Sequence, residues 1–171
     1  MKKFDVPSFY KSSFVSRIKD MRKEKDPRKK DYIPSLLDFG PVKFYIARHF
    51  GFCYGVENAI EIAYKAIEEN HGKRIYLLSE MIHNPQVNQD LLDRGVMFMM
   101  DTKGNQLISW DQLNRSDVII LPAFGTTLEI EEKISKIGLD TFKYNTTCPF
   151  VERVWKMSSN APKFNAKLHR K

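Results

Sequence analysis

Short apolar runs alternate with amphipathic helical patterns along most of this chain, and the alternation restricts the folds that it can adopt. Strand-like runs occupy residues 42–47, 74–79, 96–99, 117–121 and 141–144. Apolar residues recur at helical spacing in 56–70, 85–93, 127–137 and 149–157. Because strands that alternate with helices are joined by crossovers, the pattern predicts an α/β fold in which helices flank a small parallel sheet.

Loops that follow the carboxyl ends of parallel strands lie along one edge of the sheet, where such folds bind ligands. The loops expected at this edge are 48–55, 79–85, 122–127 and 145–149. They contain Cys53, His83 and Cys148. The sequence therefore predicts that two thiols and one imidazole converge there.

Each cysteine falls between a strand and a helix. Cys53 stands between Gly51 and Gly55, which allow a tight turn and the close approach of a ligand. Cys148 also precedes a helix, and a helix N-terminus favours a thiolate. The cysteines are either structural or metal ligands, and in the second case His83 would supply a further donor to zinc. Their wide separation in the sequence does not decide between these readings.

Other side chains at the same edge suit an anion. His83 is a candidate partner for a phosphate or carboxylate, or else a turn histidine bonded to the backbone. Thr126 and Thr127 follow Gly125 at a helix start, where they either bind an anion or cap the helix. The P-loop and dinucleotide-binding glycine patterns are absent from the sequence, which disfavours a nucleotide site.

The net charge of +7 is distributed unevenly along the chain. Residues 1–42 carry 11 Lys and Arg against 6 Asp and Glu, 43–155 carry 12 against 15, and 156–171 carry 5 against none. The basic residues therefore lie mainly in the two end segments, which disfavours nucleic-acid binding by the folded region. In the first segment, residues 13–21 form a short amphipathic helical pattern.

The location of the protein is predicted from what the sequence lacks. No apolar run is long enough to span a membrane, and no apolar signal-peptide core is present. Two distant cysteines do not make a disulfide framework. We therefore expect a cytoplasmic protein with no membrane and no nucleic-acid partner.

Four motifs fall in the loops and helix starts described above, namely His49–Val56, Glu80–Pro85, Leu121–Gly125 and Asn145–Val151. In this order and spacing they resemble the 4-hydroxy-3-methylbut-2-enyl diphosphate reductases, which catalyse the last step of the non-mevalonate isoprenoid pathway. The resemblance covers roughly residues 40–155.

The resemblance implies an iron–sulfur oxidoreductase. Members of this family hold a 4Fe–4S cluster with three cysteines and reductively remove the substrate hydroxyl, which gives isopentenyl and dimethylallyl diphosphate. Cys53 and Cys148 match two cluster ligands, and His83 matches a histidine that binds the substrate diphosphate. Phe124 stands where many members have a second such histidine. Electrons would come from an external donor such as ferredoxin or flavodoxin.

The resemblance also divides the chain. Residues 1–42 are a basic N-terminal extension, 43–155 correspond to the first of three α/β modules, and 156–171 are a basic tail unlike the family. The third cysteine and the His-x-Glu segment with its proton-relay glutamate have no counterpart, so no catalytic residue is expected in this fragment.

We therefore expect a truncated form that is inactive by itself, with an apolar face where the other modules would pack. The alternative is a non-catalytic α/β binding domain with structural or zinc-binding cysteines.

Overall fold

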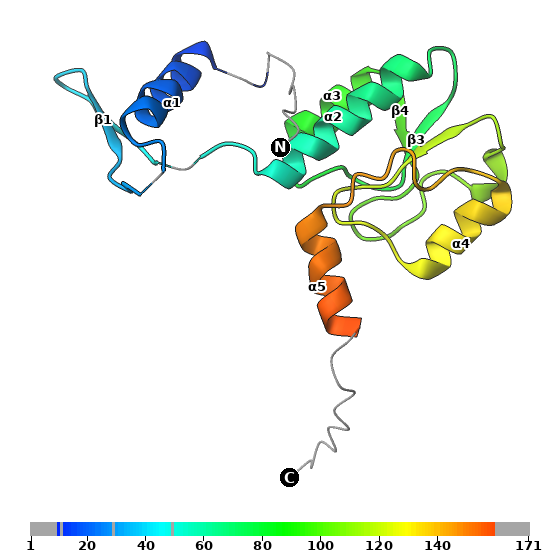
Figure 1. The fold of residues 1–171 in the computed structure, drawn as a ribbon. Coiled ribbons are helices and arrows are strands. Elements are labelled where there is room, and N and C mark those ends of the chain that lie inside the picture. The colour runs from blue at the N-terminus through cyan, green and yellow to red at the C-terminus, as the bar shows by residue number, and fades with distance from the viewer. Residues whose placement is uncertain (1–9, 11, 29, 49, 160–171) are drawn as a thin grey trace, which may run out of the picture.

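A three-stranded parallel sheet lies at the centre of the computed structural model (Figure 1). The structure describes residues 10, 12–28, 30–48 and 50–159. Strand β3 (Ile75–Leu77) runs between β4 (Val96–Phe98) and β5 (Val118–Ile120), and both neighbours are parallel to it. Three of the predicted apolar runs thus form the sheet, and the expected small parallel sheet flanked by helices is confirmed.

Helices occupy the segments that separate and follow these strands. They are α2 (Tyr54–Glu69), α3 (Pro85–Asp93), α4 (Leu128–Ile137) and α5 (Pro149–Ser159), with a short 3-10 helix, η2, at Trp110–Gln112. The bounds of the four α-helices lie within two residues of those that the periodicity predicts. Local signals account for this agreement: Asn84 caps α3 by accepting from two backbone N–H groups, and Gly138 ends α4 with a φ of +89°.

The core has two parts because side chains of a strand alternate between the faces of the sheet. Ile75 and Leu77 of β3 pack in a cluster with α2 and α3. Tyr76 points to the other face and packs in a cluster with Ile134 of α4. Both faces of the sheet are therefore covered, which explains why its strands are apolar throughout.

The prediction that residues 42–47 form the first strand of this sheet is wrong. They contain a strand, β2 (Lys43–Ile46), but it pairs antiparallel with β1 (Ser35–Asp38) in a separate two-stranded sheet. The turn explains the difference, since Gly40 has a φ of +82° and its N–H donates to the Asp38 carboxylate. A partner so near in the sequence is reached at a small cost in loop-closure entropy.

The prediction of a strand at 141–144 is also wrong. The Asp140 side chain accepts from the backbone N–H groups of Phe142 and Lys143, and this local turn replaces a strand ladder. Only a bridge between Leu121 and Asn145 remains in this stretch, parallel in sense. The chain still passes beside the end of β5, so the following loop reaches the expected edge of the sheet.

The segment that precedes α2 forms a separate unit, which we call the N-terminal arm: helix α1 (Ser13–Lys25) with β1 and β2. The helix predicted at 13–21 is confirmed and continues to Lys25. Two guanidiniums hold the arm together, because Arg22 pairs with Asp31 and Arg48 pairs with Asp26. Figure 1 shows the arm at one side of the sheet and its helices.

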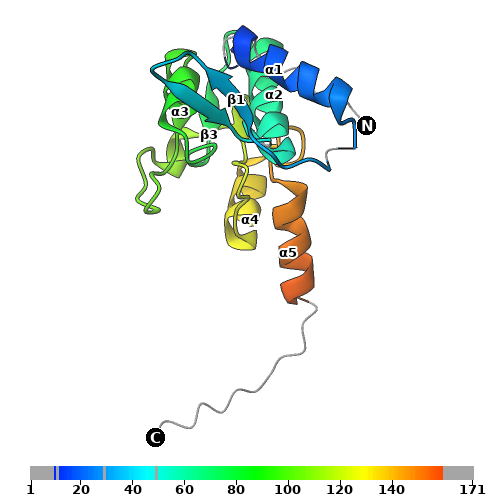
Figure 2. The same ribbon diagram turned by 90° about the vertical axis from the view of Figure 1, so that its left-hand side faces the viewer.

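Helix α5 projects from the rest of the fold in both views (Figures 1 and 2). None of its residues is buried, and Phe150, Val154 and Met157 are each more than 60% exposed. The apolar face that we expect on the module thus includes α5. Among the described residues, no helix combines the length and apolar character needed to cross a membrane.

Candidate functional site

Cys53, His83 and Cys148 line one pocket of about 340 Å³, which we call the cysteine pocket. It lies where four segments meet: those that follow β2, β3 and β5, and the one that leads into α5. The rest of its lining is mostly apolar and consists of Phe52, Gly55, Val56, Ile82, Asn84, Ala123, Phe124 and Val151. The structure therefore brings all three predicted site residues together, while their chemical roles stay predictions.

Cys53 occupies the N-cap position of α2 and is exposed. Its backbone is extended, and its carbonyl accepts from the N–H of Glu57 in the first helical turn. Gly51 shapes the preceding loop with a φ of +96°, a conformation that side chains rarely adopt. The thiol thus stands at the positive end of the α2 dipole, where an anionic ligand is stabilised.

Cys148 precedes α5 and packs against α2. Its N–H donates to the carbonyl of Ala123 over 2.9 Å, which fixes the loop beside the end of β5. A Cβ atom on Gly55 would overlap the sulfur of Cys148 and lie 3.1 Å from its Cβ. Glycine at position 55 therefore lets the loop of Cys148 approach the helix that Cys53 begins.

His83 lies in the turn between β3 and α3, and its imidazole is exposed. The ring stacks on Phe124, with centroids 4.6 Å apart and planes inclined by 30°. The two residues come from different loops, so their contact joins the β3 and β5 ends of the site. Phe124, which the resemblance marked only as a replaced histidine, is therefore part of the wall beside His83.

Asn88 holds the His83 turn and was not predicted as a site residue. It is 5% exposed, and its side chain accepts from the N–H of Met81 and donates to the carbonyl of Ile82. A polar residue on the inward face of α3 was the sequence signal that could have revealed this role. The hydrogen bonds fix the backbone immediately before His83.

A second, more polar hollow of about 250 Å³ lies on the other side of His83 and Phe124. Ser79, Thr102 and Thr126 contribute hydroxyl groups to its lining. Thr127 lies outside it, at the N-cap of α4, where its hydroxyl group beside Glu129 lowers the pKa of that carboxyl. His83 thus stands between an apolar pocket with thiols and a hollow with hydroxyl groups.

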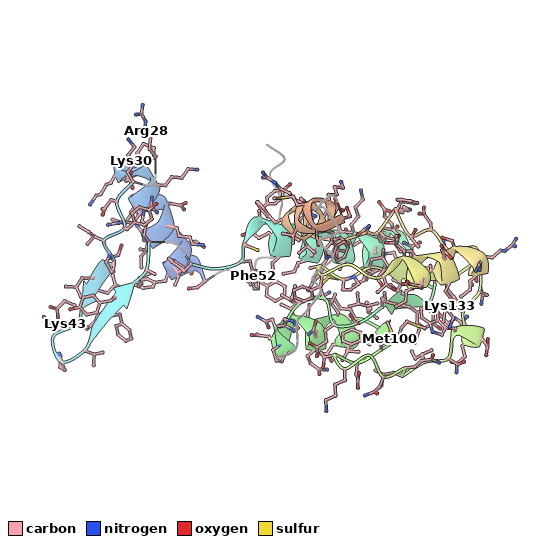
Figure 3. The ribbon with its side chains drawn as sticks, turned by 90° about the horizontal axis from the view of Figure 1, so that it is seen from below. Arg28, Lys30, Lys43, Phe52, Met100 and Lys133 are labelled. Carbon is pink, nitrogen blue, oxygen red and sulfur yellow. The ribbon has the colours of Figure 1, made fainter. Side chains whose placement is uncertain are left out.

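A third hollow, of about 600 Å³, lies between α1 and the loop of Cys53. We call it the basic hollow. Its lining consists of Lys19, Asp20, Lys23, Arg48, Phe50, Gly51, Phe52, Cys53 and Glu57. Figure 3 shows Phe52 where the arm meets the module. Phe52 and Cys53 line both the basic hollow and the cysteine pocket, so the two cavities adjoin.

The donors of the cysteine pocket bear on both metal sites that the sequence suggests, a zinc site and part of an iron–sulfur site. Among the described residues, no group of three or more His, Cys, Asp or Glu side chains is arranged to hold a metal ion. The two thiols are soft donors in an apolar pocket, which suits part of an iron–sulfur ligand set.

Comparison with known proteins decides the family. The model of the LytB protein family matches residues 44–168, which is most of the chain. This chain belongs to the LytB family. The match covers the sheet, all four of its helices and the four segments that line the cysteine pocket, and it extends past residue 155.

Curated relatives of this LytB-family chain are reductases. It is 37% identical over 121 residues to the 4-hydroxy-3-methylbut-2-enyl diphosphate reductase of Prochlorococcus marinus, covering 71% of this chain and 29% of the relative. It is 35% identical over 150 residues to the enzyme of the same name from a Nostoc species, covering 88% of this chain and 33% of the relative. The chain therefore spans about a third of the length of these relatives.

A solved structure supports the fold. The E-1-hydroxy-2-methyl-but-2-enyl-4-diphosphate reductase from Plasmodium falciparum aligns with a TM-score of 0.51 and 26% identity. The alignment covers 64% of this LytB-family chain and 33% of the solved one.

Proposed function

We propose that this LytB-family chain carries part of the active centre of a 4-hydroxy-3-methylbut-2-enyl diphosphate reductase. Cys53 and Cys148 would be two ligands of a 4Fe–4S cluster. The observation that carries the proposal is that both thiols line one largely apolar pocket. Two cysteines far apart in the sequence have no general reason to meet in this way.

The residues of the pocket have complementary roles in this proposal. When bound, the cluster would supply electrons for removal of the substrate hydroxyl, which yields isopentenyl and dimethylallyl diphosphate. The apolar wall of Phe52, Val56 and Val151 would exclude water and contact the hydrocarbon part of the substrate. His83, at the border of the more polar hollow, would donate to the diphosphate.

In this proposal the chain supplies only part of the ligand set of the cluster. The described part of the chain brings two thiols to the pocket, and the family cluster takes three. By itself the chain would therefore be inactive in the reductase reaction. An external carrier such as ferredoxin or flavodoxin would supply the electrons, and the cytoplasm would keep the thiols reduced.

Anaerobic reconstitution with iron and sulfide tests the proposal. We expect a brown protein whose visible absorbance and iron content are lost in Cys53→Ala and in Cys148→Ala. Val151→Ala is the matched control, because it alters the same pocket without removing a donor. Stoichiometric zinc binding without iron uptake would instead favour the non-catalytic binding domain.

A further inference from the structure

We propose that Trp155 is a positioning residue of the site: its indole holds the loop of Phe124 against α5 and so keeps the imidazole of His83 beside the cysteine pocket. This inference rests on the proposed function, in which His83 donates to the diphosphate of the substrate. It is carried by a series of contacts that leads from Trp155 to Gly125, along the loop to Phe124, and from there to His83.

The indole of Trp155 lies directly against the backbone of Gly125. A Cβ atom at residue 125 would overlap the indole ring and would lie 3.1 Å from the Cγ2 atom of Thr147. Gly125 has a φ of +73°, so glycine at this position allows both the turn and the close approach of the ring. The indole therefore occupies the space that a side chain would need, and it supports the loop from the side of α5.

Phe124 is held between this contact and a backbone hydrogen bond. Before it in the loop, the N–H of Ala123 donates to the carbonyl of Met81, and after it the indole packs against Gly125. Phe124 is 45% exposed and His83 is exposed as well, so burial does not fix the stacking of their rings. The stacking therefore depends on where the backbone of the loop is held.

Trp155 shares one face of α5 with two groups of the site. Cys148, Val151 and Trp155 are separated by three and then four residues, which is the spacing of a single helical face. Cys148 and Val151 both line the cysteine pocket. Among the described residues, Trp155 belongs to neither of the two clusters of the core. Its packing is therefore directed at the loop of the site, and it fixes that loop relative to the thiol of Cys148.

The imidazole signals in the proton NMR spectrum of the full chain, recorded at constant pH, test the inference. Stacking on Phe124 should displace the ring protons of His83 upfield, and His83→Gln identifies these signals among those of the four histidines. Phe124→Leu should remove the displacement. We expect Trp155→Ala to remove about half of it or more, because the loop then no longer holds the Phe124 ring over the imidazole.

Trp110→Ala is the matched control. It removes the other tryptophan of the chain, which packs with the core cluster of Tyr76 and Ile134 and lines neither the cysteine pocket nor the polar hollow. It should lower stability in urea unfolding and leave the His83 signals unchanged. Trp155→Phe keeps a shorter ring and should give an intermediate displacement, so the test remains decisive if circular dichroism shows that Trp155→Ala does not fold.

Wild-type His83 signals in Trp155→Ala and Trp155→Phe would overturn the inference and leave Trp155 as an anchor of α5 alone. An equal change in Trp110→Ala would reduce the effect to a general loosening of the fold and overturn the inference too. So would the absence of an upfield displacement in the wild type.

Failure of this inference differs from failure of the proposed function. A chain that takes up iron and sulfide, but whose His83 signals do not depend on Trp155, overturns the positioning role alone. A chain that takes up no iron contradicts the proposed function, whereas the effect of Trp155 on His83 is measured without iron and is decided separately.

Discussion

Gly55 in the first turn of α2 packs directly against the thiol of Cys148, and no side chain fits between them. The contact joins the helix that Cys53 begins to the loop of the second cysteine. A substitution at residue 55 therefore tests whether the two loops must meet for the site to form.

Gly55→Ala should destabilise the fold although alanine is the better helix former by about 1 kcal/mol. The new methyl group overlaps Cys148, and overpacking of this kind costs about 1–3 kcal/mol. Urea unfolding measures the loss, and reconstituted iron content should fall with it. Asn58→Ala, in the same helix, is the control. Wild-type iron content in Gly55→Ala would show that the close contact is dispensable.

Asn88→Ala should lower the free energy of unfolding by about 2 kcal/mol, because the Met81 N–H and the Ile82 carbonyl lose their buried partner. The exposed neighbour Gln89 offers a matched control, and Gln89→Ala should change stability by less than about 0.5 kcal/mol. Urea unfolding compares the two variants. Equal effects would mean that Asn88 does not hold the turn before His83.

The stability contributed by Asp90 should depend on pH. Partial burial opposes its ionisation, but hydrogen bonds from Tyr64, Arg94 and Tyr10 together hold its pKa below the ordinary value. For a lowered folded-state pKa, the contribution is complete above the unfolded-state value of about 4, and it is lost as pH falls through the folded-state value.

Asp90→Asn should therefore cost about 1 kcal/mol near neutral pH, and the difference from the wild type should shrink as pH falls below about 4. Urea unfolding at several pH values measures it. Asp93→Asn, three residues away and exposed, should show little effect at any pH. A cost for Asp90→Asn that stays constant down to acid pH would refute the role of ionisation.

The exposed side of α5 should make the isolated chain associate. Phe150, Val154 and Met157 follow helical spacing, so they form one apolar stripe. Sedimentation velocity should show concentration-dependent association that Phe150→Ser with Val154→Ser reduces. Arg153→Ser on the same helix is the comparison, and if it reduces association as much, the stripe is not responsible.

The pattern of apolar residues predicted the strands of the parallel sheet and missed two local features, the β1–β2 hairpin and the turn at Asp140. The strands Ile75–Leu77 and Val118–Ile120 are buried on both faces, so their apolar runs were unambiguous. The run at 42–47 was also predicted as a strand of this sheet, but its partner, Ser35–Asp38, lies in the segment that the sequence analysis assigned to a basic extension. At 141–144 the side chain of Asp140 formed a turn that a count of apolar residues cannot detect.

The candidate site was likewise predicted only in part from the sequence. The convergence of Cys53, His83 and Cys148 was predicted, but its premise holds only for His83, which follows a strand of the parallel sheet. Cys53 follows the antiparallel β2, and Cys148 reaches the pocket through the N–H that it donates to Ala123. The contact of Gly55 with Cys148 and the stacking of Phe124 on His83 join residues from different loops, so no local pattern predicts them. The basic residues of α1 were assigned to an N-terminal extension, and the position of Lys19 and Lys23 beside Cys53 appears only in the folded chain.

The chain passes from the arm to α2 through Phe50, Gly51, Phe52 and Cys53, so the thiol stands on the connection between two bodies. Lys19 contacts the Phe50 ring at this connection, and the hydroxyl of Tyr10 donates to Asp90 of α3. Phe52 lines both cavities, and its ring packs against that of Tyr10 with centroids 5.9 Å apart. The basic hollow and the cysteine pocket therefore share Phe52 as a common wall, and any displacement of this ring would change the shape of both cavities.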